Sequence, residues 1–202
     1  MHERWVEFFF ALEDCESDMK RTKSFFDLRD ALAEPGCAVC RLNADTADRF
    51  LDSLLWESVN DPGIRRDIRQ SQGFCRQHAW ELILDGSSLG VAILMHDLFK
   101  NLHRTIENAR YQGVSALSVR RTQEALNRQL PSVATEELVT QLSPQKACPA
   151  CAQVSKMESI YLTTLLDHLG ARGGSDSLLP GFEASDGLCL PHFRQALTLV
   201  RG

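Results

Sequence analysis

The sequence contains no apolar run long enough to span a bilayer and no alternation of apolar and polar residues long enough to indicate a β-strand. The first absence argues against a transmembrane helix, and the second favours an all-α chain. The apolar run from Val6 to Leu12 is short, is interrupted by Glu7 and follows no basic region, so we expect no signal peptide. We therefore expect a cytoplasmic protein of one large or two small domains, since 202 residues that are 44% hydrophobic can bury a substantial core.

An excess of positive charge is also missing. Lysine and arginine total 22 against 27 acidic residues, which gives a formal net charge of −5 at pH 7. Nonspecific binding to nucleic acid normally requires a basic face, so this partner class is disfavoured. The short basic stretch at residues 65–69 is interpreted as a solvated helix face rather than as an anion or partner site.

Six of the seven cysteines belong to one pattern that occurs twice. The pattern is a CxxC pair followed later by a CxxH pair. Its eight members are Cys37, Cys40, Cys75 and His78 in the first copy, and Cys148, Cys151, Cys189 and His192 in the second. The seventh cysteine, Cys15, has no partner in the pattern and is interpreted as a solitary, partly buried thiol. A repeated pattern of this kind indicates metal sites rather than a disulfide framework, and favours a reducing compartment.

Each copy supplies three sulfur ligands and one imidazole, which is a complete tetrahedral shell for zinc. Residues three apart at the start of a helix lie on one face, and the exposed N–H groups there stabilise the thiolate form. We predict two zinc ions. Iron–sulfur clusters remain the alternative, because three cysteines and one histidine can also hold a cluster. A thioredoxin-type dithiol is disfavoured, since the sequence shows no βαβ setting.

The pairing of the motifs is left open by the sequence. The simpler assumption is that each CxxC pair shares a metal with the CxxH pair of its own copy. In the alternative, crossed arrangement, Cys37 and Cys40 would join Cys189 and His192.

Helical periodicity in nearly every segment predicts a helical bundle built from two similar metal-stapled units. We expect an N-terminal helical segment at 1–34, a first repeat at 35–115, and connecting helices with a second repeat at 116–202. The residues near 88–110 form the most apolar predicted helix, which we expect to be central and heavily buried. Asp61 and Pro62 predict a helix start, and Gly73 predicts the end of the same helix. The similar order of motifs in both repeats indicates an internal duplication.

A possible secondary polar site lies on the same predicted central helix. His96, His103 and Glu107 are seven and then four residues apart and so share a face, to which Asp167 or His168 could contribute from another helix. The interpretation we favour is a polar stripe or a hydrogen-bonded core histidine.

Asp61-Pro62, Arg65, Gly73-Phe74-Cys75 and His78, preceded by Cys37 and Cys40, resemble a bacterial family of unknown function with paired CPxC and GFCxxH motifs. The resemblance is best in residues 35–105 and weaker in the second repeat. Ala38 replaces the proline of the first CPxC motif. The family implies a helical protein with metal ligands at the matched cysteine and histidine positions, and it implies no catalytic residue.

The leading hypothesis is a non-enzymatic cytoplasmic protein with two structural Cys3His zinc sites and a surface that binds a protein or small-molecule partner. The alternative is a redox or sensor protein that carries iron–sulfur clusters or oxidisable zinc thiolates. An enzyme that uses His96, His103 and Glu107 with a separate metal is a weaker third hypothesis. The sequence does not identify the partner, the substrate or the oligomeric state.

Overall fold

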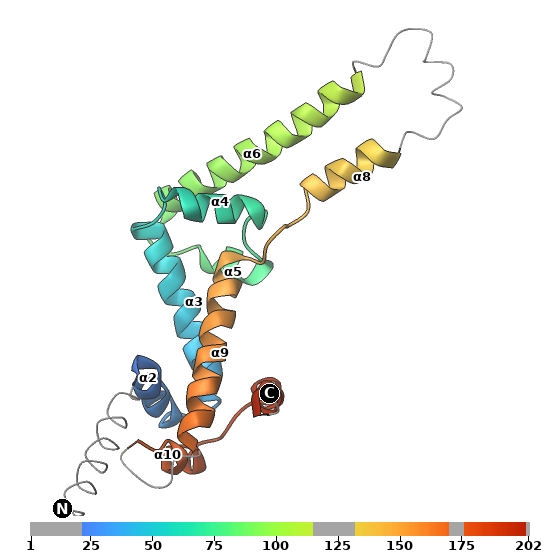
Figure 1. Cartoon of the computed structure of the whole chain (residues 1–202). Helices are drawn as coiled ribbons and strands as arrows, with labels where there is room; N and C mark the ends of the chain where they lie inside the picture. Colours follow the sequence, from blue (N-terminus) through green and yellow to red (C-terminus); the bar gives the residue numbers. More distant parts are fainter. Residues whose placement is uncertain (1–21, 115–131, 170–175, 201–202) are drawn as a thin grey trace, which may run out of the picture. The chain divides into compact units, whose positions relative to one another are not determined.

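The computed structural model describes residues 22–114, 132–169 and 176–200 (Figure 1). Every regular element in these ranges is an α-helix, so the predicted all-α class is confirmed. The helices are α2 (Lys23–Leu32), α3 (Ala38–Trp56), α4 (Pro62–Gln70), α5 (Arg76–Glu81), α6 (Ser88–Val114), α8 (Ser132–Gln141), α9 (Pro149–Leu169), α10 (Leu179–Ala184) and α11 (Leu190–Val200). None of the described helices is both long enough and apolar enough to cross a membrane. Cys15 and most of the predicted N-terminal segment lie outside the described residues.

The chain divides into two compact units, which we describe separately. Unit 1 comprises residues 1–46 and 154–202, and unit 2 comprises residues 47–153. The boundaries fall inside α3 and α9, so each of these helices contributes residues to both units. The predicted division at 1–34, 35–115 and 116–202 groups the residues differently and stays a prediction.

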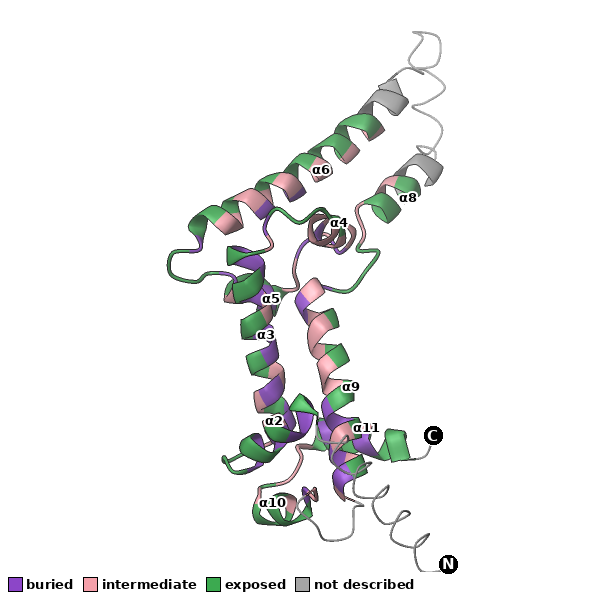
Figure 2. Ribbon diagram, turned by 60° about the vertical axis from the view of Figure 1, so that its left-hand side comes forward, coloured by how far each residue is buried: buried purple, intermediate pink, exposed green. Residues whose placement is uncertain are grey.

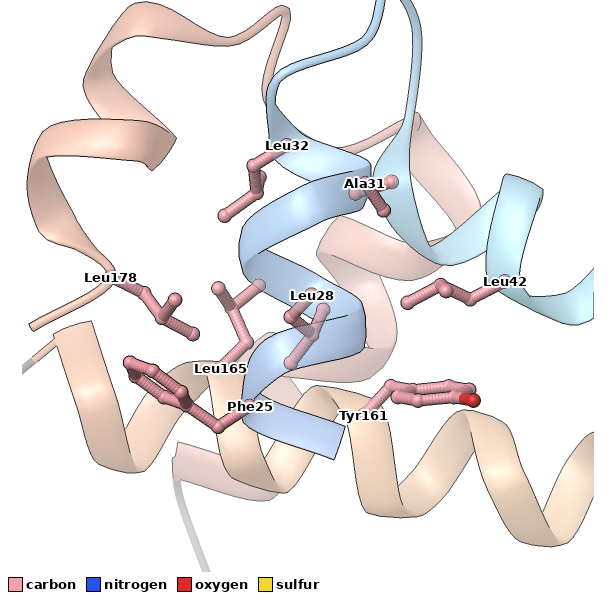
Figure 3. Packing of buried hydrophobic residues seen from close by; sticks show 9 residues of the cluster. Phe25, Leu28, Ala31, Leu32, Leu42, Tyr161, Leu165 and Leu178 are labelled. Atoms are coloured by element: carbon pink, nitrogen blue, oxygen red, sulfur yellow. The ribbon is translucent and has the colours of Figure 1, made fainter. Parts of the chain in front are cut away.

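The core of unit 1 forms around α2 (Figure 3). Phe25, Leu28 and Leu32 are spaced three and four residues apart, so they lie on one face of α2 and are buried together. The whole cluster consists of Phe25, Leu28, Ala31, Leu32, Ala38, Leu42, Tyr161, Leu165 and Leu178. A smaller cluster of Val39, Leu162 and Ala196 joins the start of α3 and the middle of α11 to α9. Unit 1 is therefore assembled from segments far apart in the sequence.

The core of unit 2 includes part of the predicted metal-binding pattern. Its buried cluster consists of Leu51, Leu54, Leu55, Val59, Ile68, Leu82, Leu94, Cys148 and Ala150. Two further cysteines, Cys75 and Cys151, are partly buried and pack against it. The ligands of this unit are thus continuous with its apolar core.

The local signals around α4 are confirmed. The side chain of Asp61 accepts a hydrogen bond from the backbone N–H of Ile64 at 2.8 Å, and Pro62 occupies the first turn. At the other end Gln72 and Gly73 adopt φ values of 56° and 97°, and the Gly73 N–H bonds to the carbonyl of Ile68 at 2.8 Å. This left-handed backbone conformation, which favours glycine, ends α4 and turns the chain towards Cys75.

The helix α6 differs from its prediction. Leu94 and Leu98 are buried, but Leu89 and Phe99 are 73% and 63% exposed and Ile106 is also exposed. Figure 2 shows mostly exposed and intermediate residues along the described part of this helix. The expectation of a heavily buried helix is therefore wrong for these side chains, because α6 buries one narrow stripe and leaves its other apolar residues in solvent.

Candidate metal centres

The eight predicted ligands gather into two groups of four. The first centre consists of Cys37, Cys40, Cys189 and His192, and the second centre consists of Cys75, His78, Cys148 and Cys151. In each group the ligand atoms all lie within 4.8 Å of one another. The first centre belongs to unit 1 and the second to unit 2. Among the described residues, no other group of three or more such side chains converges in this way.

Each centre combines a CxxC pair from one sequence repeat with a CxxH pair from the other. The simpler assumption of pairing within each repeat is wrong, and the crossed alternative is the observed arrangement. Cys40 and Cys189 are 149 residues apart, whereas His78 and Cys148 are 70 residues apart. The second centre, which joins His78 to Cys148, therefore lies within the stretch of chain between Cys40 and Cys189 that the first centre closes.

All four motifs stand at helix starts, as predicted. Cys37, Cys75, Cys148 and Cys189 each immediately precede a helix, and the carbonyl of each accepts a hydrogen bond from the N–H four residues on, at 2.9–3.2 Å. The second ligand of every motif lies in the following helical turn. Two helix N-termini therefore meet at each centre, where their N–H groups and dipoles favour anionic sulfur.

Short hydrogen bonds hold the segments that lead into the centres. The backbone N–H of Gly36 donates to Asp186 Oδ2 at 2.7 Å, which joins the segment before Cys37 to the segment before Cys189. In unit 2 the carbonyl of Gln70 accepts the N–H of Gln145 at 2.7 Å, and Lys146 Nζ pairs with Asp67 Oδ1 at 2.9 Å. These contacts bring the segment before Cys148 alongside the end of α4.

The separations within each centre fit a single tetrahedral ion. With zinc–sulfur and zinc–nitrogen bonds of ordinary length, tetrahedral geometry separates sulfurs by about 3.8 Å and sulfur from nitrogen by about 3.6 Å. The observed Sγ–Sγ distances are 3.6 Å for Cys40–Cys189 and 3.6 Å for Cys75–Cys151. The sulfur–Nδ1 distances are 3.1–3.5 Å around His192 and 3.2–3.6 Å around His78. The donor set and its spacing therefore suit zinc.

Each histidine turns Nδ1 towards the sulfurs and Nε2 towards a glutamate. His192 Nε2 lies 2.7 Å from Glu158 Oε1, whereas His78 Nε2 lies 3.7 Å from Glu81 Oε2. Sequence reasoning missed both carboxylates. Glu81, three residues after His78, carried a local signal, but nothing in the sequence near Glu158 pointed to a contact with a residue 34 positions later.

The thiols of the first centre differ in their tendency to ionise. Burial opposes ionisation of Cys37, but hydrogen bonds from the backbone N–H groups of Cys189 and Cys40 outweigh it and lower the pKa to about 6. Burial and the neighbouring sulfurs of Cys189 and Cys37 raise the pKa of Cys40 to about 12. Without a cation, one sulfur ionises readily and thereby opposes ionisation of the next.

In the second centre, too, one thiol has a lowered pKa and another a raised one. Burial of Cys75 is outweighed by a backbone hydrogen bond from His78 and side-chain hydrogen bonds from neighbouring thiols, which lower its pKa. Burial and the nearby sulfurs of Cys75 and Cys148 raise the pKa of Cys151 to about 12. A divalent cation would relieve the repulsion that raises the pKa of Cys151.

Metal uptake should therefore release protons. With pKa values of about 12, Cys40 and Cys151 carry protons at pH 7 before the ion binds, so each ion must displace at least one proton. Affinity should rise with pH, and at the first centre it should fall more steeply below pH 6, where Cys37 also becomes protonated. Calorimetric zinc titrations in buffers of different ionisation enthalpy measure the released protons. Uptake without proton release at pH 7 would contradict this picture.

The possible secondary site does not assemble into a group of converging ligands. His96 is exposed, and His103 pairs along its own helix, with Nδ1 3.4 Å from Glu107 Oε2 and with both side chains more than half exposed. His168 is buried on another helix, where Nδ1 lies 2.7 Å from the carbonyl of Asp176 and the ring packs on Phe25. The contacts of His103 and Glu107 are those of a polar stripe, and those of His168 are those of a hydrogen-bonded core histidine.

The basic stretch at residues 65–69 serves local structure. Arg65 donates to the carbonyl of Val59 and to Asn60 Oδ1, each at 2.9 Å, and Arg69 pairs with Asp97 at 2.9 Å. These guanidinium groups hold α4 against the segment that connects it to α3 and against α6.

Comparisons with known proteins give a family but no activity. A family model described as "Family of unknown function (DUF6062)" matches residues 19–201. A protein of Caldicellulosiruptor sp. (strain Rt8B.4), named "Uncharacterized 23.9 kDa protein in xynA 3'region", is 41% identical over 68 residues. The matched stretch covers 34% of this chain and 33% of that relative, so it spans about a third of the relative's length. No solved structure matches the chain.

Proposed function

The chain belongs to the DUF6062 family of unknown function, and from that premise we propose that it is a zinc-stapled binding protein. In this proposal each Cys3His centre holds one structural zinc ion, and the helical surface binds a protein or small-molecule partner. The match of the family model to residues 19–201 confirms the resemblance to a helical family of unknown function, but the family supplies no activity. The observation that carries the proposal is the convergence of three sulfurs and one imidazole nitrogen within 4.8 Å, twice in one chain.

The close spacing of the ligand atoms favours a single ion over an iron–sulfur cluster. The four ligands of a cluster bind at least two different iron atoms, which bridging sulfides keep apart, so the four ligand atoms cannot all lie as close together as those of a single ion. Here all four ligand atoms of each centre lie within 4.8 Å of one another. Zinc also binds three thiolates and one imidazole in tetrahedral geometry, because its filled d shell favours no other arrangement.

The centres are better suited to holding the fold than to catalysis. Four protein ligands complete the tetrahedral shell of zinc and leave no position for a reactive water. Three thiolates leave a zinc centre with about one net negative charge, which the converging helix N-termini stabilise. We therefore assign the eight ligands a structural role and assign no catalytic residue.

Exposed apolar side chains in unit 2 support a role in partner binding. Trp56, Trp80 and Ile83 are 61%, 69% and 68% exposed, so these large apolar side chains are available to contact a partner. Tryptophan is also enriched among residues that dominate binding energies. The six cysteines of the two centres are free thiols, which fits the proposed location in a reducing compartment such as the cytoplasm.

The order of the elements also supports the proposed duplication. A long helix follows each CxxC pair, in α3 and α9, and a shorter helix follows each CxxH pair, in α5 and α11. In a duplicated chain, each centre would combine the CxxC pair of one repeat with the CxxH pair of the other, so the two centres would be equivalent.

A redox or sensor function is the second candidate, because the first centre presents a sulfur to solvent. Cys40 is exposed, whereas Cys148 of the second centre is buried. An oxidant could convert the adjacent sulfurs of Cys40 and Cys189 to a disulfide and release the ion.

Elemental analysis with an absorbance spectrum separates these functions. The full chain, purified without added metal or oxidant, should be colourless and contain two zinc ions, and both should remain after brief exposure to hydrogen peroxide. Iron with acid-labile sulfide and visible absorbance would overturn the zinc assignment. Loss of zinc from the first centre, with formation of a Cys40–Cys189 disulfide, would favour the sensor function.

A further inference from the structure

The histidine of the first centre is held by a second set of polar contacts that the second centre lacks. Glu158 Oε1 lies 2.7 Å from His192 Nε2, on the side of the ring opposite the sulfurs. The side chains of His192 and Glu158 are 8% and 21% exposed, so the contact is shielded from most solvent. This contact therefore retains much of its electrostatic strength.

The carboxylate of Glu158 is itself fixed from two other helices. Asn43 Nδ2 on α3 donates to Oε1 at 3.3 Å, and Gln195 Nε2 on α11 donates to Oε2 at 3.3 Å. Asn43 Oδ1 is buried without a hydrogen-bond partner, so this amide gives up one bond in order to donate to the carboxylate.

The second centre provides a contrast within the same chain. Glu81 Oε2 stands 3.7 Å from His78 Nε2, beyond hydrogen-bond distance, and has no hydrogen-bond partner. The other oxygen of Glu81 accepts a hydrogen bond from Gln77, on its own helix, at 3.0 Å. His78 is therefore positioned by its helix and by the core around it rather than by a carboxylate.

We infer that Glu158 is the positioning residue of the first centre, which secures zinc there by holding the proton of His192 on Nε2 and leaving Nδ1 free to bind the ion. The inference rests on the proposed zinc-binding function. A carboxylate in this place fixes the tautomer and ring orientation of the imidazole and makes its other nitrogen a stronger ligand. Glu158 thereby makes the two centres unequal, since only the first depends on a carboxylate.

Zinc release from the full-length, zinc-loaded chain into excess chromophoric chelator tests this role. Two phases are expected, and the phase missing in His192→Ala belongs to the first centre. Glu158→Gln keeps the size of the side chain but removes its charge, and should speed that phase by about 10- to 100-fold. The other phase and the melting temperature at saturating zinc should not change. Glu81→Gln, the matched control, should alter neither phase.

Two results would overturn the inference. The first is unchanged release from Glu158→Gln; if the melting temperature at saturating zinc also falls, Glu158 serves packing alone. The second needs no variant: nitrogen NMR of labelled histidine should show the ion on Nδ1 of His192 and a protected Nε2–H, and an ion on Nε2 would refute the role. A wild-type chain that binds no zinc would instead refute the proposed function itself.

Discussion

Chelation of both zinc ions should unfold most of the helical structure of units 1 and 2. Structural zinc contributes an apparent binding free energy of about 10–16 kcal/mol in zinc-finger peptides near neutral pH. This value equals or exceeds the roughly 5–15 kcal/mol by which a whole domain is normally stable. The buried clusters of the two units also contact the centres, since Cys148 is part of the unit 2 core and Cys37 packs against the Val39, Leu162 and Ala196 cluster of unit 1.

Each zinc ion also joins segments that are far apart in the sequence, and this cross-linking adds to the stability lost on chelation. By analogy with a disulfide, a link that closes a loop such as the 70 residues between His78 and Cys148 removes unfolded-state entropy worth about 4 kcal/mol. Once the ions are removed, the chain loses this constraint and must bury or solvate six reduced thiols.

Far-ultraviolet circular dichroism before and after a zinc chelator measures the expected loss of helix. Added zinc should restore the signal, whereas magnesium should not, because magnesium prefers oxygen ligands. Full helicity and an unchanged melting temperature in metal-free protein would show that the centres do not support the fold.

Substitution of one histidine ligand should remove one ion and weaken one unit. His192→Ala should empty the first centre and His78→Ala the second, and each should lower the melting temperature. The larger fall is expected for His78→Ala, because the sulfurs of the second centre pack against the main core of unit 2, whereas Cys40 of the first centre is exposed.

Two substitutions outside the centres serve as controls. His103→Ala removes a histidine whose exposed side chain pairs along its own helix, and Cys15→Ser removes the cysteine that stands outside the repeated pattern. Neither should change the metal content. Two ions retained in both His192→Ala and His78→Ala would refute the assignment of these ligands.

Local signals in the sequence were sufficient to predict much of this structure. The all-α class follows from helical periodicity, and the start of α4 follows from Asp61 and Pro62, whose capping role depends only on adjacent residues. The convergence of the eight ligands into two groups was likewise indicated by residue type and spacing. The helical periodicity and the cap depend on interactions within a few residues, whereas the ligands were indicated by their residue types, although Cys40 and Cys189 lie 149 residues apart.

Features that depend on distant contacts were not predicted. The spacing of the motifs is the same for pairing within or between repeats, so only the packing around Val39, Leu162 and Ala196 reveals the crossed arrangement at the first centre. Glu158 is indistinguishable in sequence from any exposed helical glutamate. The apolar residues of α6 indicated burial, but a hydrophobic pattern does not show whether another element covers that face.

The metal content of two double variants tests the crossed zinc centres most directly. After dialysis against a weak chelator, wild-type protein should contain two zinc ions. Cys40→Ser with His192→Ala damages only the first centre and should retain one ion, whereas Cys40→Ser with His78→Ala damages both and should retain none. If the first double variant retains no ion and the second retains one, the ligands pair within each repeat and the crossed arrangement is refuted.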